Sequence, residues 1–219
     1  MGDLILLADR RAARRSRPRA PAADGAPFSA TLWFDLTSPF TYLAAERAER
    51  AFPRLRWRPT YAALRHAHVL GESDRALAER RAEALGMPLV WPERVASHWR
   101  AAARAAAHAA DLGRGAEFVL AAGRLAFCGG FDLDDPEVLA EAGEAAGIMP
   151  SECLAVAAAT ERDAVIEVAT DCLEAAGADA VPTLQIGQRL FCGEHRLSEA
   201  IAVAGSGTQA GNSPLPHVS

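Results

Sequence analysis

Cysteine is scarce in this 219-residue chain, and no two cysteines have the C-x-x-C spacing that dithiol redox sites use. The four cysteines are Cys128, Cys153, Cys172 and Cys192, and the six histidines add no zinc-ligand spacing to them. We therefore expect neither dithiol redox chemistry nor a metal site. Free thiols in a cytoplasmic protein are the expected state of these cysteines.

Long apolar runs are also missing, which argues against a membrane-spanning helix. The apolar piece at residues 4–8 is too short for the core of a signal peptide, and its charges follow it instead of preceding it. The formal net charge is −5, so composition favours neither nucleic acid nor an anionic membrane as a partner. A hydrophobic content of 50% is enough for one sizeable core.

The two ends of the chain have the composition of disordered tails. Residues 1–28 contain six arginines between positions 10 and 19, set among alanine and proline. A nucleic-acid-binding arm and a transit peptide are the alternatives for such a segment. Residues 205–219 are rich in Gly, Ser and Pro, and we expect them to be disordered as well.

Between the tails, hydrophobic periodicity predicts a small sheet divided by a long helical segment. Strands are expected near 31–36, 55–59, 183–186 and 189–192. Helices are expected at 74–85, 92–112, 116–128, 135–147, a short one from Pro150, 163–176 and 197–204. The interpretation is a split sheet domain, 29–60 and 178–204, with an all-helical domain, 61–177, inserted into it.

One junction between a strand and a helix carries the chemistry. The apolar strand ends at Leu36, and Ser38 and Pro39 then suit the N-cap and the first position of a helix. That geometry leaves free backbone N–H groups and the positive end of the helix dipole above Ser38. A thiolate or a carboxylate is the natural occupant, although Ser38 is equally suited to be only a helix cap. No G-x-S-x-G motif surrounds Ser38, so a serine hydrolase is not indicated.

The stretch F-D-L-T-S-P-F-T-Y-L (34–43) closely resembles the opening of 2-hydroxychromene-2-carboxylate isomerases and kappa-class glutathione transferases. These are DsbA-like thioredoxin-fold proteins in which serine replaces the first cysteine. Val181-Pro182-Thr183 resembles the thioredoxin-fold loop that carries a cis-proline, and L-F-C-G-E-H-R-L (190–197) resembles the isomerases' F-W-G-x-D-R-L. The resemblance covers about residues 30–204. It implies an α/β fold, a thioredoxin fold with a large all-helical insertion.

The resemblance also implies an activity. The chain is expected to be a glutathione- or thiol-dependent isomerase that acts on an aromatic hydroxy or oxo carboxylate, a small-molecule substrate. A kappa-type glutathione transferase and a non-catalytic thioredoxin-fold binding protein are the alternatives, and a homodimer is left open. Ser38 is the implied catalytic residue, because its hydroxyl would stabilise the thiolate. The implied binding residues for glutathione or another low-molecular-weight thiol are Ser38, Val181, Pro182, Glu194, His195 and Arg196.

Two departures from the family pattern concern the binding of glutathione. His195 stands where the family has an Asp that holds the charged amino end of the γ-glutamyl arm, and Glu194 is the neighbouring replacement. The stretch 65–72 is short and lacks the family's Lys and Asn; the chain contains no lysine. Thr41 occupies the position of the second cysteine, and we expect it to face the helix interior and pack there. Cys192 is expected to be a core or edge thiol.

Overall fold

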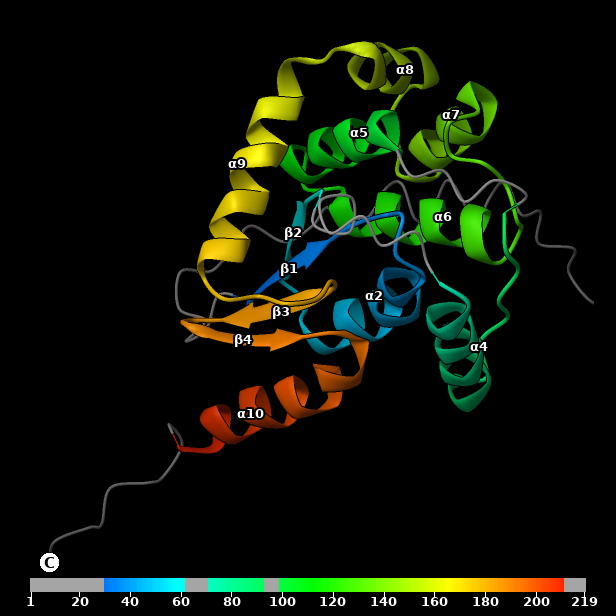
Figure 1. The fold of residues 1–219 in the computed structure, drawn as a ribbon. Helices are drawn as coiled ribbons and strands as arrows, with labels where there is room; N and C mark the ends of the chain where they lie inside the picture. The colour runs from blue at the N-terminus through cyan, green and yellow to red at the C-terminus, as the bar shows by residue number, and fades with distance from the viewer. Residues whose placement is uncertain (1–29, 62–70, 93–98, 211–219) are drawn as a thin grey trace, which may run out of the picture.

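A computed structural model describes residues 30–61, 71–92 and 99–210, and in this part four strands form one sheet. The strands are β1 (Ala30–Phe34), β2 (Arg56–Pro59), β3 (Thr183–Ile186) and β4 (Arg189–Cys192), in the order β2-β1-β3-β4 (Figure 1). β1 pairs parallel with β2 and antiparallel with β3, and β3 and β4 form a hairpin. The four predicted strands and their single sheet are confirmed.

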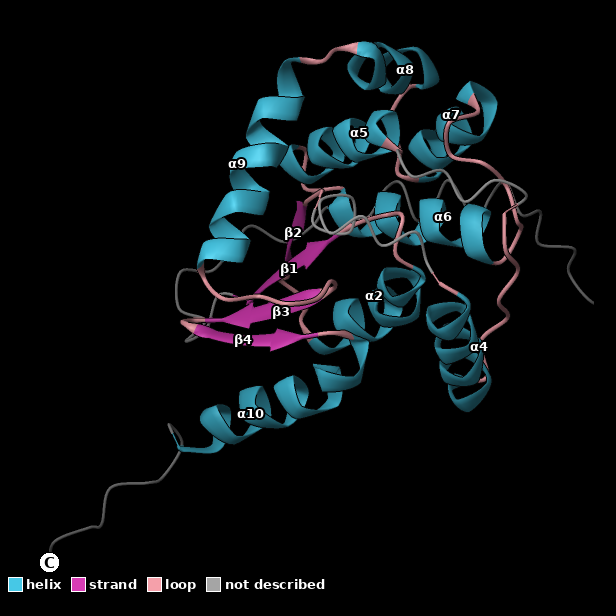
Figure 2. Cartoon of the chain, in the orientation of Figure 1, coloured by secondary structure: helices cyan, strands magenta, loops and turns pink. Residues whose placement is uncertain are grey.

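Helix α2 (Pro39–Ala51) connects β1 to β2, and within the described residues the chain from β2 to β3 forms helices only. These are α4 (Glu72–Leu85), α5 (Arg100–Asp111), α6 (Gly115–Phe127), α7 (Pro136–Ala145), α8 (Pro150–Ala158) and α9 (Glu161–Ala175). The short 3-10 helix η1 (Glu194–Arg196) and α10 (Leu197–Ala210) follow the sheet. Figure 2 shows the sheet enclosed by these helices. No helix in the described ranges combines the length and hydropathy needed to cross a bilayer.

The alternation of side chains along β1 assigns its two faces to different partners. Leu32 and Phe34 belong to the main hydrophobic core, together with Leu184 of β3. Trp33 points to the opposite face and packs against Ala169 and Leu173 of α9. Helix α10 packs against β3 and β4, α5 packs against β2, and α9 lies on the Trp33 face of the sheet (Figure 1).

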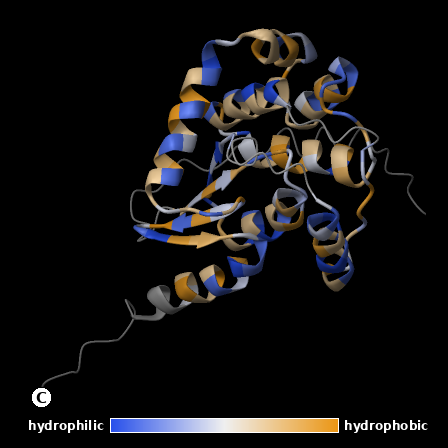
Figure 3. Ribbon diagram, viewed as in Figure 1, coloured by the Kyte–Doolittle hydropathy of each residue, from blue (hydrophilic) through white to orange (hydrophobic). Residues whose placement is uncertain are grey.

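The main core is continuous between the sheet and the helices. It joins Leu43 of α2 with Phe118 and Phe127 of α6 and with Leu139 of α7. Its central helix, α6, is mostly hydrophobic, whereas the peripheral α4 is mostly hydrophilic (Figure 3). The helices between β2 and β3, expected as an inserted helical domain over 61–177, share one core with the sheet. The many small alanines of α5 allow this close packing.

Helix α10 corrects the expected C-terminal tail. It runs to Ala210 instead of ending at residue 204, so Gly205 does not stop it. A glycine inside a helix costs only about 1 kcal/mol relative to alanine, which an established helix can absorb. Some of the expectations concern segments outside the described residues. These segments are residues 1–28, most of the short stretch 65–72, residues 93–98 of the expected 92–112 helix, and residues 211–219.

Two glycines in helices give a test of the packing. A Cβ on Gly143 of α7 would lie 2.8 Å from the Cβ of Cys153, a residue that is 1% exposed, whereas nothing lies within 4 Å of a Cβ on Gly205. We expect Gly143→Ala to lower the free energy of unfolding by about 1–3 kcal/mol through overpacking. Gly205→Ala should raise it by up to about 1 kcal/mol. Chemical denaturation measures both, and equal effects would contradict the close contact of α7 and α8.

Candidate active site at the tip of helix α2

A tight turn after β1 sets the position of Ser38. The Asp35 carboxylate, which is buried, accepts hydrogen bonds from the backbone N–H of Thr37 at 2.9 Å and from its hydroxyl at 2.7 Å. The Ser38 N–H donates to the Asp35 carbonyl at 3.2 Å. Aspartate commonly stabilises turns by bonding to the backbone two residues onward. The turn therefore places Ser38 at the N-cap position, immediately before Pro39, the first residue of α2.

The hydroxyl of Ser38 does not cap α2. Ser38 has extended backbone angles, φ −86° and ψ 118°, which suit an N-cap, but its side chain accepts no hydrogen bond from the helix. Instead the Oγ atom donates to the carbonyl oxygen of Val181 at 3.4 Å. That distance is long for a bond between two oxygens, so this contact is weak and a stronger acceptor would displace it. The interpretation of Ser38 as only a helix cap is not supported by this geometry.

Val181 and Pro182 reach the tip of α2 from the other end of the chain. The Val181–Pro182 peptide bond is cis, and Val181 packs against the cluster of Trp33, Ala169 and Leu173. The Pro182 carbonyl accepts a hydrogen bond from the N–H of Gly193 at 2.9 Å. The structure thus brings Ser38, Val181 and Pro182 together, as expected from the two motifs, while their roles in binding and catalysis stay predictions.

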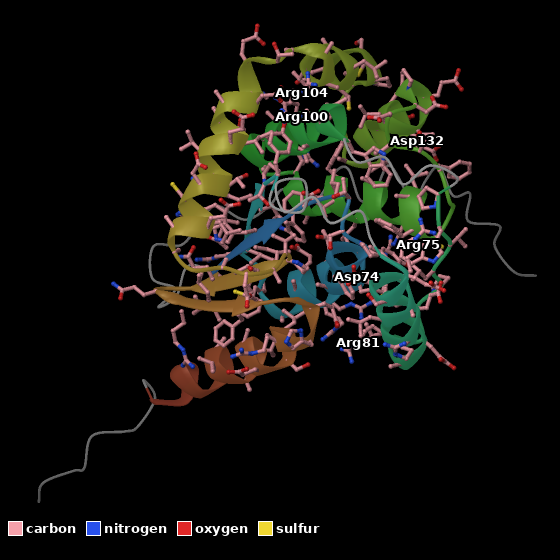
Figure 4. All side chains as sticks on the ribbon, in the orientation of Figure 1. Asp74, Arg75, Arg81, Arg100, Arg104 and Asp132 are labelled. Carbon is pink, nitrogen blue, oxygen red and sulfur yellow. The ribbon has the colours of Figure 1, made fainter. Side chains whose placement is uncertain are left out.

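Glu194, which the sequence offers as the neighbouring replacement for the family's Asp, is buried between two arginines. Its side chain is 1% exposed, and both carboxylate oxygens are held by arginines. Arg81 of α4 binds it through Nε at 2.8 Å and Nη2 at 3.1 Å, and Arg47 of α2 donates to it through Nη1. Figure 4 shows Arg81 on the side of α4 that faces α2. The carboxylate of Glu194 is thus paired with two guanidinium groups, and its role as a ligand contact stays a prediction.

The surroundings of Glu194 lower its pKa. Burial alone would raise the pKa of this carboxyl group, but the hydrogen bonds and charges of Arg81 and Arg47 outweigh that effect. A lowered pKa in the folded state means that the ionised carboxylate stabilises the fold at neutral pH. This contribution is fully present above the pKa of the unfolded chain and is lost as the pH falls through the lower, folded value.

His195 and Arg196 are both exposed on η1. The ring of His195 lies close over Gly193, where an added Cβ would come within 2.8 Å of it. Arg196 is paired with Glu199 through two hydrogen bonds of 2.5 and 3.0 Å. Neither residue has a described contact with Ser38 or Val181, and their role as ligand contacts stays a prediction.

Sequence reasoning missed the two arginines that hold Glu194. No local pattern marks them, because Arg47 and Arg81 are separated from Glu194 by 147 and 113 residues. The role of Asp35 was also missed, although the spacing of Asp35 and Thr37 is itself the signal of an aspartate-stabilised turn.

We expect Glu194→Gln to lower the free energy of unfolding by about 3 kcal/mol at neutral pH, because two arginines lose their buried counter-charge. The stability of the wild-type protein should also fall more steeply than that of the variant below about pH 4.3, the usual pKa of glutamate. Denaturant titrations across pH measure both effects. Glu199→Gln, at an exposed pair, is the matched control and should hardly change stability. Parallel pH profiles of wild type and Glu194→Gln would contradict the assignment.

The four cysteines, all in the described part of the chain, are free. Cys128 and Cys172 are exposed, and Cys153 is buried. Burial, and to a lesser extent the charge of Glu152, raise the pKa of the Cys153 thiol. Because the thiolate is the reactive form and must be reached by the reagent, Cys153 should be less reactive than Cys128 and Cys172.

Alkylation of protein purified without reductant should label Cys128 and Cys172 first and Cys153 last. Mass spectrometry at successive times measures the order, and the unfolded protein, in which the thiols should react alike, is the control. An intramolecular disulfide in the purified protein would contradict the free thiols.

Residues 31–201 match the family model of the DSBA-like thioredoxin domain. The chain belongs to this family. Its thioredoxin elements are the sheet, α2 and the Val181–Pro182 loop, and the family assignment agrees with the fold expected from the sequence.

Solved structures show the same fold. A 2-hydroxychromene-2-carboxylate isomerase is 22% identical with a TM-score of 0.69, covering 84% of this chain and 99% of that one. A "probable DsbA oxidoreductase" from Streptomyces coelicolor is 18% identical with a TM-score of 0.63, covering 87% and 94%. The oxidoreductase DsbA from Xylella fastidiosa is 14% identical with a TM-score of 0.52, covering 87% and 90%. No curated protein matches the chain.

Proposed function

We propose that this DsbA-like protein binds a low-molecular-weight thiol at Ser38 and uses it to isomerise a small aromatic hydroxy or oxo carboxylate. Glutathione is the first candidate for the thiol, and the isomerase is of the 2-hydroxychromene-2-carboxylate type. The observation that carries the proposal is the Ser38 hydroxyl, which lies at the tip of α2, makes no cap bond and is held only weakly by the Val181 carbonyl.

Dithiol exchange, the chemistry of a DsbA oxidoreductase, does not fit this site. Ser38 and Thr41 stand at the two positions where the C-x-x-C motif would place sulfur, and their hydroxyl oxygens cannot form a disulfide. What the position retains is the start of a 13-residue helix, with the positive end of its dipole. That environment favours a sulfur anion brought by a ligand, as helix N-termini favour cysteine thiolates.

The residues at the tip of α2 suit the sulfur end of such a ligand. The Ser38 hydroxyl would turn from the Val181 carbonyl to the sulfur and donate a charge-assisted hydrogen bond to it. The backbone of Val181 would then be left to pair with the peptide part of the ligand, as an added strand does. When bound, the thiolate supplies a nucleophile that adds to a conjugated carbon, allows rotation about the former double bond and leaves again by elimination. Ser38 stabilises the thiolate and is not itself the nucleophile.

The γ-glutamyl end of glutathione is less well matched, and this favours a second candidate. His195 replaces the family's Asp, and the Glu194 carboxylate is already bound by Arg47 and Arg81. A non-catalytic thioredoxin-fold protein, or one that uses a thiol other than glutathione, would need no carboxylate there. A kappa-type glutathione transferase shares the same thiolate and differs only in the electrophile.

The free cysteines support a reducing compartment such as the cytoplasm.

We expect Ser38→Ala to reduce thiol-dependent turnover by about one to two orders of magnitude. One hydrogen bond to a charged group, worth roughly 1.5–3 kcal/mol, would be lost. Because Ser38 makes no cap bond, stability should fall by less than the about 1 kcal/mol that loss of a cap causes. Steady-state kinetics on a 2-hydroxychromene-2-carboxylate and denaturant titrations measure the two effects. Thermal shifts with glutathione and with S-methylglutathione report binding of the thiol.

Asp135→Ala is the matched control, because Asp135 does cap a helix: its side chain accepts from the Glu137 N–H at 2.8 Å at the start of α7. It should lose about 1 kcal/mol of stability with thiol binding unchanged. If Ser38→Ala behaves like Asp135→Ala, Ser38 is merely a cap and the proposed site is wrong. Binding of glutathione without turnover would favour the non-catalytic candidate.

A further inference from the structure

A second hydroxyl lies in the first turn of α2 and has no hydrogen-bond partner in the part of the chain that the structure describes. Thr41 is 2% exposed, and its Oγ1 atom has no hydrogen-bond partner among the described residues. Threonine within a helix commonly bonds back to a carbonyl of the preceding turn, but the Thr41 hydroxyl does not. A buried hydroxyl without a partner destabilises a protein, so each such group calls for an explanation.

The position of Thr41 in the helix directs it toward Ser38. Thr41 is the third helical residue, one turn beyond the N-cap, and residues three apart share a helix face. Helical Cα–Cβ bonds tilt toward the N-terminus, and the side chain at this position is the one that reaches back to the N-cap residue in a capping box. Here the Ser38 N–H, which such a side chain would bind, already donates to the Asp35 carbonyl. The Thr41 hydroxyl therefore lies in the first turn of the helix, without a hydrogen-bond partner among the described residues.

We propose that Thr41 is a second hydroxyl donor to the sulfur of the bound thiol, acting beside Ser38. The inference rests on the proposed function and names a residue that sequence reasoning had assigned to packing alone. A thiolate accepts several hydrogen bonds, whereas a neutral thiol is a weak acceptor. Two hydroxyls at one helix start would thus select the ionised form of a low-molecular-weight thiol. A valine would fill nearly the same volume as Thr41 and would bury no unpaired hydroxyl. Because packing alone does not require the hydroxyl of Thr41, we infer that this hydroxyl bonds to a ligand.

The test compares Thr41→Val with Thr41→Ser in the full chain, with glutathione as the ligand. The ultraviolet absorbance of the thiolate, recorded against pH, gives the pKa of the bound thiol, and S-methylglutathione is the blank. Thr41→Val should raise that pKa by about one to two units, which corresponds to one lost hydrogen bond to a charged group. Its melting temperature should be unchanged or higher, because a buried, unpaired hydroxyl has gone.

Thr41→Ser should show the opposite combination. It keeps the hydroxyl, so the pKa of the bound thiol should stay close to that of the wild type, and it loses a buried methyl group, so its melting temperature should fall. A residue that only packs would move the melting temperature and leave the thiol pKa unchanged in both variants.

The outcomes separate this inference from the proposed function. If Ser38→Ala raises the pKa of the bound thiol and Thr41→Val does not, the thiol site stands and the role of Thr41 is overturned. If the wild-type protein does not lower the pKa of glutathione at all, both are overturned. A raised pKa in Thr41→Val, with Thr41→Ser unchanged, supports the second donor.

Discussion

The antiparallel pairing of β1 with β3 is the constraint on which the site depends. The register sets Trp33 opposite Thr183. If this register is continued for two residues beyond Trp33 and Thr183, Val181 lies opposite Asp35, where the turn begins. Ser38 and Val181, 143 residues apart in the chain, therefore meet because their strands are neighbours at the centre of the sheet. A slip of one residue would turn Leu32 out of the core and separate the two halves of the site.

The ion pairs of Glu194 add a second long-range constraint. One buried carboxylate joins η1 to α2 and α4, so the segment after β4 is held to the same helix that carries Ser38 at its other end. Such a group is expensive to bury, and it is stable here because two guanidinium groups supply hydrogen bonds as well as charge. The carboxylate therefore contributes to holding the fold together.

The same geometry explains how one fold can host different chemistry. The start of a thioredoxin-type helix concentrates N–H groups and a partial positive charge. It therefore stabilises a sulfur anion whether the sulfur belongs to a cysteine side chain or to a ligand. With Ser38 and Thr41 in place of cysteines, this chain keeps the electrostatics and gives up the disulfide. In the proposed function, the thiol therefore comes from a bound ligand instead of from a cysteine side chain.

The sequence by itself determined the local structure: the four strands, most of the helices and the turn that leads into α2. Alternation, helical spacing, and proline and glycine at element ends act over a few residues, so they can be read without a fold. Only the tertiary structure decided what the polar groups do. In it the Ser38 hydroxyl bonds to Val181 instead of its own helix, and Glu194 is paired with two arginines. The Thr41 hydroxyl has no hydrogen-bond partner within the described ranges. The tertiary structure also merged the helices with the sheet in one core. The physical reason is that a side chain's hydrogen-bond partner is set by distance in space, and residues more than 100 positions apart leave no local pattern to show that they meet.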